Sequence, residues 1–144
     1  GSGTAAKFDS VADLTIDNQG FLYVADYFNN MIRKVSTTGE VTTVAGNGAA
    51  GAADGLAADA TFDRPAGVAF HADGSIMVAD SRNRRIRKIV PGVVVNTIAG
   101  SGTAGFGDGA GSSASFNKPN AIAVDNQNNI YVADNYRVRK IAAP

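Results

Sequence analysis

The chain has 144 residues, of which 44% are hydrophobic and 18% charged, and its formal net charge is zero. This composition suits one globular domain with a substantial core and excludes a disordered chain. The absence of cysteine excludes disulfides and thiolate chemistry, and a single histidine, His71, excludes a multi-histidine metal site within one chain. The apolar runs are too short to span a bilayer, so we expect no contact with membranes.

Four short predicted strands follow Phe8 in the first part of the chain. They are rich in β-branched and aromatic residues and are bounded by Gly, Asn and Asp, which is typical of strands. No segment keeps the apolar period of 3.6 residues that a helix needs. In chain order the predicted strands are 11–17, 22–26, 32–35 and 40–46.

The same order of elements recurs twice, each time 54 residues further along, after Phe62 and Phe116. The second unit has strands at 65–71, 76–80, 86–89 and 94–100, and the third has strands at 119–125, 130–134 and 138–141. The third unit ends before a fourth strand. Units of this length with four strands each are typical of propeller blades. We therefore predict an all-β fold, with residues 1–144 forming a single repeat domain of three blades at about 8–46, 62–100 and 116–141.

Gly-rich loops at 47–61 and 101–115 separate the predicted blades. Gly46, Gly48 and Gly51 fit the G-x-G-x-x-G pattern that can bind phosphates, but the pattern recurs in the second loop and no helix follows it. We interpret each loop as the connection from the outer strand of one blade to the inner strand of the next.

These motifs together resemble the NHL repeat family of β-propellers. The resemblance rests on Pro-x-Gly-Val-Ala at 65–69, D-x-x-G-x-L-Y-V-A-D at 17–26, and the recurring I-R-K and T-ϕ-A-G segments. The units depart from one another where Val11 replaces the proline of the others, and where His71 replaces their aspartate. The resemblance implies a propeller whose rim carries recognition loops.

Three blades do not complete a propeller, which usually has four to eight. Two copies give six, and the charge distribution favours head-to-tail pairing. Residues 1–63 hold eight acids against three bases, whereas residues 64–144 hold five acids against ten bases. We predict a homodimeric six-bladed ring, in which the last blade lacks its fourth strand. The alternative is an excised or engineered part of a longer repeat chain.

The loops between the second and third strands of each blade are the predicted binding surface. They carry aromatic, Arg and Asn side chains, the usual material of recognition, although the same residues also suit ordinary polar turns. The candidates are Tyr27, Phe28, Asn29, Asn30, Arg82, Asn83, Arg84, Arg85, Asn135, Tyr136 and Arg137. We expect these loops and the Gly-rich loops to share one rim, which is also the predicted surface for binding another protein.

Other functions are less favoured by the sequence. The basic run at 82–88 suggests RNA binding as one hypothesis. The neutral net charge and the acidic first half of the chain disfavour it. A ligand-binding or metal-dependent hydrolytic site in the central channel is the main alternative. However, no nucleophile set can be assembled, so we predict no enzyme, no metal and no cofactor. We interpret Asp26, Asp80 and Asp134 as turn residues that accept backbone N–H bonds where the chain leaves the second strand. Arg33, Arg87 and Arg139 are interpreted as structural residues, each available to pair with an acidic neighbour. The predicted function is a non-catalytic scaffold that self-associates.

Overall fold

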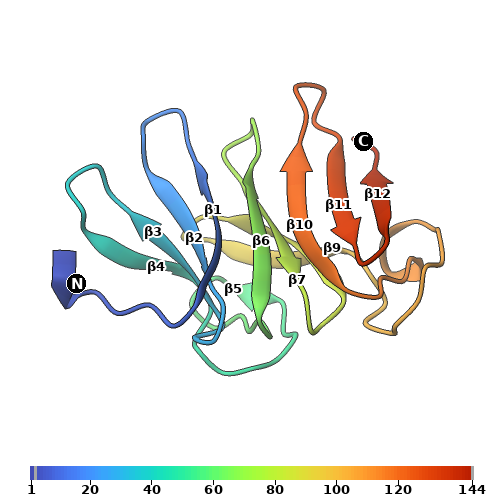
Figure 1. The fold of residues 1–144 in the computed structure, drawn as a ribbon, viewed down its shortest axis with the longest axis horizontal. Coiled ribbons are helices and arrows are strands. Elements are labelled where there is room, and N and C mark those ends of the chain that lie inside the picture. Colours follow the sequence, from blue (N-terminus) through green and yellow to red (C-terminus); the bar gives the residue numbers. More distant parts are fainter. Residues whose placement is uncertain (2, 144) are drawn as a thin grey trace.

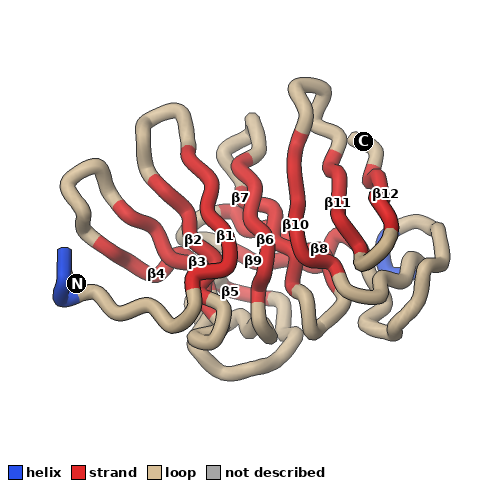
Figure 2. Tube along the Cα trace, viewed as in Figure 1, coloured by secondary structure: helices blue, strands red, loops and turns tan. Residues whose placement is uncertain are grey.

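The computed structural model of the chain describes residues 1 and 3–143. It contains three antiparallel sheets, one for each sequence repeat, arranged side by side like the blades of a propeller (Figures 1 and 2). The predicted all-β propeller architecture is confirmed, and the predicted strands agree with the observed ones to within one residue at either end. None of the helices in the described part of the chain has the length and apolarity needed to cross a membrane.

Each blade is a meander in which successive strands pair with each other. The first blade has the order β1-β2-β3-β4. Over the described residues the third blade has only β10-β11-β12, as predicted. The strands of the first blade are β1 (Val11–Ile16), β2 (Leu22–Asp26), β3 (Met31–Val35) and β4 (Val41–Ala45). Those of the second are β6 (Pro65–Phe70), β7 (Ile76–Asp80), β8 (Arg85–Val90) and β9 (Val94–Ala99), and those of the third are β10 (Pro119–Val124), β11 (Ile130–Asp134) and β12 (Arg137–Ile141).

The strand register is the same in all three blades. The innermost strand has an irregularity at its start in each case, at 11–13, 65–67 and 119–121, where one residue is skipped in the pairing. Such a bulge bends the strand and increases its twist. The recurrence of this detail shows that the 54-residue repeat fixes the local geometry as well as the number of strands.

The Gly-rich loop at 47–61 is more structured than the sequence indicated. It connects β4 to the innermost strand of the next blade as predicted, but it also forms a two-residue strand, β5 (Gly55–Leu56), on the outer edge of β9. The second blade therefore has five strands instead of four. In the first blade, Gly1 exchanges hydrogen bonds with Val41 of β4 in the same way. Two short 3₁₀ turns complete the described elements: η1 (Gly3–Ala5) precedes β1, and η2 (Gly111–Ser113) lies in the second Gly-rich loop.

The hydrophobic core lies between blades. One cluster joins blade 1 to blade 2 and a second joins blade 2 to blade 3, and each contains a buried phenylalanine from the start of a unit, Phe62 or Phe116. The middle blade thus packs on its neighbours with both faces, whereas blades 1 and 3 each pack with one face.

The two edges of the blades carry different loops. The β1–β2, β6–β7 and β10–β11 turns lie at the upper edge in Figure 1. The turns after β2, β7 and β11 lie at the lower edge, together with the Gly-rich loops and the segments that enter β1, β6 and β10 (Figure 1). This lower edge, called the rim below, is where the predicted binding loops gather.

Candidate interaction surfaces

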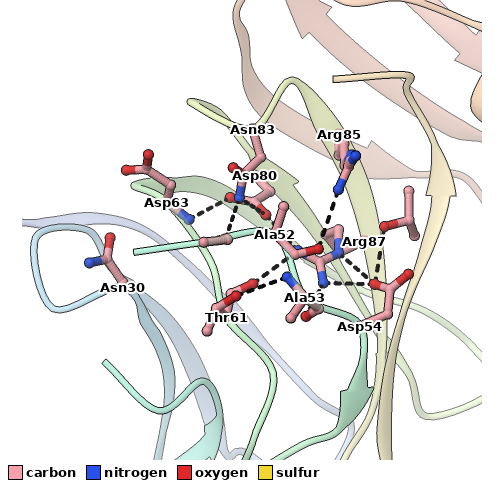
Figure 3. A network of polar contacts seen from close by, with 12 residues as sticks. Asn30, Ala52, Ala53, Asp54, Thr61, Asp63, Asp80, Asn83, Arg85 and Arg87 are labelled. Atoms are coloured by element: carbon pink, nitrogen blue, oxygen red, sulfur yellow. Dashed lines mark hydrogen bonds and ion pairs between the residues drawn. The ribbon is translucent and has the colours of Figure 1, made fainter. Parts of the chain in front are cut away.

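A buried ion pair anchors the rim of the second blade. Arg87 and Asp80 are both fully buried, and the Arg87 Nη1 lies 2.7 Å from the Asp80 Oδ2. The Arg87 Nη2 also lies 2.7 Å from the Oδ1 of Asp54, which belongs to the Gly-rich loop (Figure 3). The carbonyls of Ala53 and Thr61 accept further bonds from this guanidinium. Since a buried charge is costly unless it is paired, the network fixes the loop to the blade.

The same pairing recurs in the other two blades. Arg33 lies 3.2 Å from Asp26, and Arg139 lies 3.4 Å from Asp134 and 2.7 Å from Asp108 of the second Gly-rich loop. Each guanidinium also lies over the phenylalanine that begins its unit: Phe8 for Arg33, Phe62 for Arg87 and Phe116 for Arg139. The interpretation of the three arginines as structural residues that pair with acidic neighbours is confirmed.

The aspartates act on a different part of the chain than the sequence suggested. Their carboxylates accept backbone N–H groups located 17 residues earlier, in the segment entering the innermost strand: those of Asp9, Asp63 and Asn117. The predicted backbone bonds from the segment that leaves the second strand are not observed in the described residues. The donors from that segment are the side chains of Asn29 and Asn83. Burial raises the pKa of Asp80 to about 6, although bonds from Asn83, the Asp63 N–H and Arg87 favour its charged form.

The turns at the opposite edge are also organised by carboxylates. Burial tends to raise the pKa of Asp17, but bonds from the Phe21 and Gln19 N–H groups outweigh it and hold this pKa below its usual value. In the second blade His71 stands at this position, and Asp73, two residues later, lies 2.8 Å from its Nδ1. His71 therefore has a structural role in the turn between β6 and β7.

Several of the predicted binding residues hold rim loops together. The Asn30 side chain donates to the carbonyl of Gly48, the Asn83 side chain to that of Gly51 at 2.6 Å, and Arg85 to that of Ala52. These bonds confirm that the turns and the Gly-rich loops share one rim. The candidates that remain exposed are Phe28, Arg82, Asn135, Tyr136 and Arg137.

A polar cleft of about 580 Å³ opens between the three blades on the rim. Tyr27, Arg82 and Arg84 were among the predicted candidates, and Ser81 belongs to the same predicted loop as the two arginines. The four lining residues that were missed are Asp63, Arg64, Asn117 and Lys118. All four precede an innermost strand, and antiparallel pairing with the second strand places these entry segments beside the predicted turns. That topological relation was the signal that could have found them.

The charges around this rim cleft are mostly positive. Arg64, Arg82, Arg84 and Lys118 face one carboxylate, Asp63, which lies 4.0 Å from the Arg82 Nε. Within the described residues, the Nε of Arg84 is buried and has no hydrogen-bond partner. The cleft is therefore lined by many hydrogen-bond donors and by a single carboxylate that can accept from them.

The outward face of blade 1 exposes side chains whose counterparts are buried elsewhere. Leu14 on β1 is 53% exposed, whereas Val68, at the same position of β6, is 3% exposed, and Ile122 on β10 is also buried. Ile16 is exposed as well. Because Val68 and Ile122 pack against the preceding blade, this face has the composition of an inter-blade interface.

The outward face of blade 3 is exposed in the complementary way. Val138 on β12 is 76% exposed, while its counterparts Ile32 and Ile86 are fully buried against the following blade. Ala133 on β11 is likewise exposed, unlike the equivalent Ala79. The two outward faces thus carry apolar residues at positions that are buried in the internal interfaces, although over the described residues blade 3 lacks the fourth strand that contributes Ala45 and Ala99 to those interfaces.

The family follows from the repeats together with comparisons to known proteins. The NHL repeat model matches residues 62–89 and 116–139. The second and third blades are therefore NHL repeats, in a chain that folds as a β-propeller. A structure of a protein of unknown function from Bacteroides thetaiotaomicron is 27% identical, with a TM-score of 0.80 over 85% of this chain and 32% of that one. An auxiliary nutrient binding protein from Bacteroides ovatus is 28% identical, with a TM-score of 0.77 over 90% and 36%.

Sequence relatives of this NHL-repeat chain are much longer proteins. Protein SUPPRESSOR OF QUENCHING 1, chloroplastic, from Arabidopsis thaliana is 38% identical over 82 residues, which are 56% of this chain and 8% of that protein. The chain spans about a third of the two similar solved structures. Virginiamycin B lyase from Staphylococcus aureus, at 13% identity and a TM-score of 0.55, shares the fold alone. Within residues 1 and 3–143, no three His, Cys, Asp or Glu side chains gather as a metal site would require.

Proposed function

We propose that this NHL-repeat chain is a non-catalytic interaction module that pairs with a second copy of itself. The outward face of blade 3 in one copy packs on the outward face of blade 1 in the other. Two such contacts, related by a two-fold axis, give a ring of six blades, within the usual range for propellers.

The observation that carries this proposal is the burial of equivalent residues inside the chain. Val138 is 76% exposed where Ile86 is fully buried, and Leu14 is 53% exposed where Val68 is 3% exposed. Covering each half-exposed Leu, Ile or Val contributes about 1 kcal/mol. The equivalence of these positions to buried ones supports packing of the two outward faces on each other.

Charge supports the head-to-tail orientation. Blade 1 belongs to the acidic part of the chain, whereas Arg137 and Lys140 on β12 are exposed cations of blade 3. Pairing blade 1 with blade 3 brings opposite charges together, while pairing blade 1 with blade 1 brings like charges together.

The test uses two charge substitutions, one on each outward face, and a control away from both. Val138→Asp disrupts the blade 3 face and Leu14→Asp the blade 1 face. Val93→Asp changes an exposed valine in the β8–β9 turn of the middle blade. Each mass is measured by light scattering on a sizing column. We expect the first two variants to be monomers and the control to keep the mass of the unmodified dimer.

Mixing the two disrupted variants separates the possible arrangements. Head-to-tail packing leaves one intact contact between Val138→Asp and Leu14→Asp, so the mixture should form an open dimer. If Val138→Asp alone remains a dimer, the interface joins two blade 1 faces and the proposed orientation is wrong. If the unmodified chain is a monomer, the pairing itself is refuted, and the faces are left to other blades or to a different protein.

A further inference from the structure

The rim cleft contains several cationic side chains that are not paired with a carboxylate of the described residues. The arginines of the blade networks, Arg87 and Arg139, each lie 2.7 Å from a carboxylate. By contrast, the described residues provide no carboxylate within 4.0 Å of Arg64, Arg84 or Lys118. Like charges gathered in a cleft repel one another, and a bound anion removes that cost.

We propose that the rim cleft binds a small organic anion that carries a phosphate group or several carboxylates. Four cations face a single carboxylate, so the cleft has a net positive charge of three. Tyr27 and Asn117 also line the cleft, and their side chains have a hydroxyl and an amide N–H as neutral donors. Guanidinium groups bind phosphate and carboxylate oxygens in pairs, which makes these the anions that match the cleft.

The orphaned nitrogen of Arg84 points to the same ligand class. Its Nε is buried and lacks a hydrogen-bond partner among the described residues. A buried donor without an acceptor is costly, and because Arg84 lines the cleft, an anion bound there would add acceptors beside its guanidinium.

The backbone around the cleft is held in place before any ligand arrives. The Arg64 N–H donates to Asn30 Oδ1 at 3.0 Å, and the guanidinium lies 5.4 Å from the centre of the Phe28 ring. The Lys118 N–H donates to the buried Asp134 at 2.7 Å. Arg64 also keeps a left-handed backbone with φ of 54°. Binding therefore requires little ordering of the site, which favours affinity.

The size of the cleft favours a small molecule over a nucleic acid. A volume of about 580 Å³ is within the range of small-ligand sites. RNA binding uses an extended basic track and aromatic platforms for bases. Here the cations lie at one point, and the Tyr27 and Phe28 rings already lie beneath Arg64. The inference needs only one chain and does not rest on the proposed pairing.

Calorimetric titration with pyrophosphate and with citrate tests the site directly. We expect both to bind at a one-to-one ratio per chain, with glucose as the uncharged control. Arg84→Gln and Lys118→Gln should each weaken binding about tenfold, the loss of one charge-assisted contact. Arg137→Gln removes an exposed rim cation outside the cleft and should change the affinity less than about twofold, since distant exposed charges are screened.

Two results would overturn the inference. If Arg137→Gln weakens binding as much as Lys118→Gln, the anions respond to diffuse charge and the cleft is not a site. If a ten-residue oligouridine binds more tightly than citrate and competes with it, the rim is a nucleic-acid surface instead. Lys118 is exposed, so Lys118→Gln keeps the test valid even if Arg84→Gln perturbs folding, and thermal melts of every variant check this.

Discussion

Substituting Arg87 by methionine tests the network that holds the Gly-rich loop to its blade. Methionine keeps an apolar stem but removes all five bonds that the guanidinium donates, including those to Asp54 and Asp80. Asp80 is then left fully buried without its cation. Breaking a buried pair in this way costs about 3–5 kcal/mol of unfolding free energy. For a chain of this size, that lowers the thermal midpoint by roughly 10 °C.

Arg33→Met is the matched control, because its network is less complete. Arg33 is 15% exposed, donates one bond to Asp26 at 3.2 Å, and has a buried Nε without a partner among the described residues. Thermal melts followed by circular dichroism should show a smaller loss for Arg33→Met, about half that of Arg87→Met. If Arg33→Met costs as much as Arg87→Met, the loop contacts contribute nothing and this reasoning fails.

The pH dependence of the Arg87→Met cost is part of the same prediction. Burial raises the pKa of Asp80 to about 6, so the stability linked to its proton is present at low pH and is lost as the pH rises through that value. Without the charge of Arg87 this pKa rises further. The variant should therefore be closer to the unmodified protein at pH 5 than at pH 8.

Two other predictions concern the turns and the loops. Bonds from the Asn129 side chain and other groups hold the pKa of Asp125 below its ordinary value of 3.8, so its contribution is present above that pH and is lost as the pH falls. Asp125→Asn should therefore lose less stability than the unmodified chain between pH 5 and 2, as measured by urea unfolding, and an unchanged acid slope would contradict this. Gly46→Ala should destabilise the chain more than Gly39→Ala in the same assay. Both glycines have positive φ, but only the Cβ added at Gly46 would lie 2.7 Å from the Asn30 carbonyl oxygen. Equal losses would show that this close approach is unimportant.

Much of the fold was predictable because the same pattern of strands and turns occurs three times in the sequence. The strands and the pairing of Arg87 with an acidic residue were predictable from residues that recur along the chain. The shorter third unit was predictable because its counterpart of the fourth strand is missing from the sequence. Strand β5 was not predictable, because Gly55 and Leu56 carry no alternating pattern and form a strand only where the edge of β9 offers partners.

The rim was only partly predictable, for a similar reason. The sequence identified Arg82 and Arg84 as surface turn residues but did not connect them to Arg64 and Lys118. These residues meet only because blades stand side by side and each strand entry lies next to the preceding turn. Contacts between repeats depend on how blades are placed in space, which the period of the sequence does not specify.

The solution mass of the unmodified chain tests the central claim most directly. Light scattering across a concentration series measures it without labels or substitutions. We expect a mass of twice 14.7 kDa that persists on dilution into the low micromolar range, as a ring closed by two contacts requires. A folded chain of 14.7 kDa at every concentration would contradict the claim that its two outward faces are complementary.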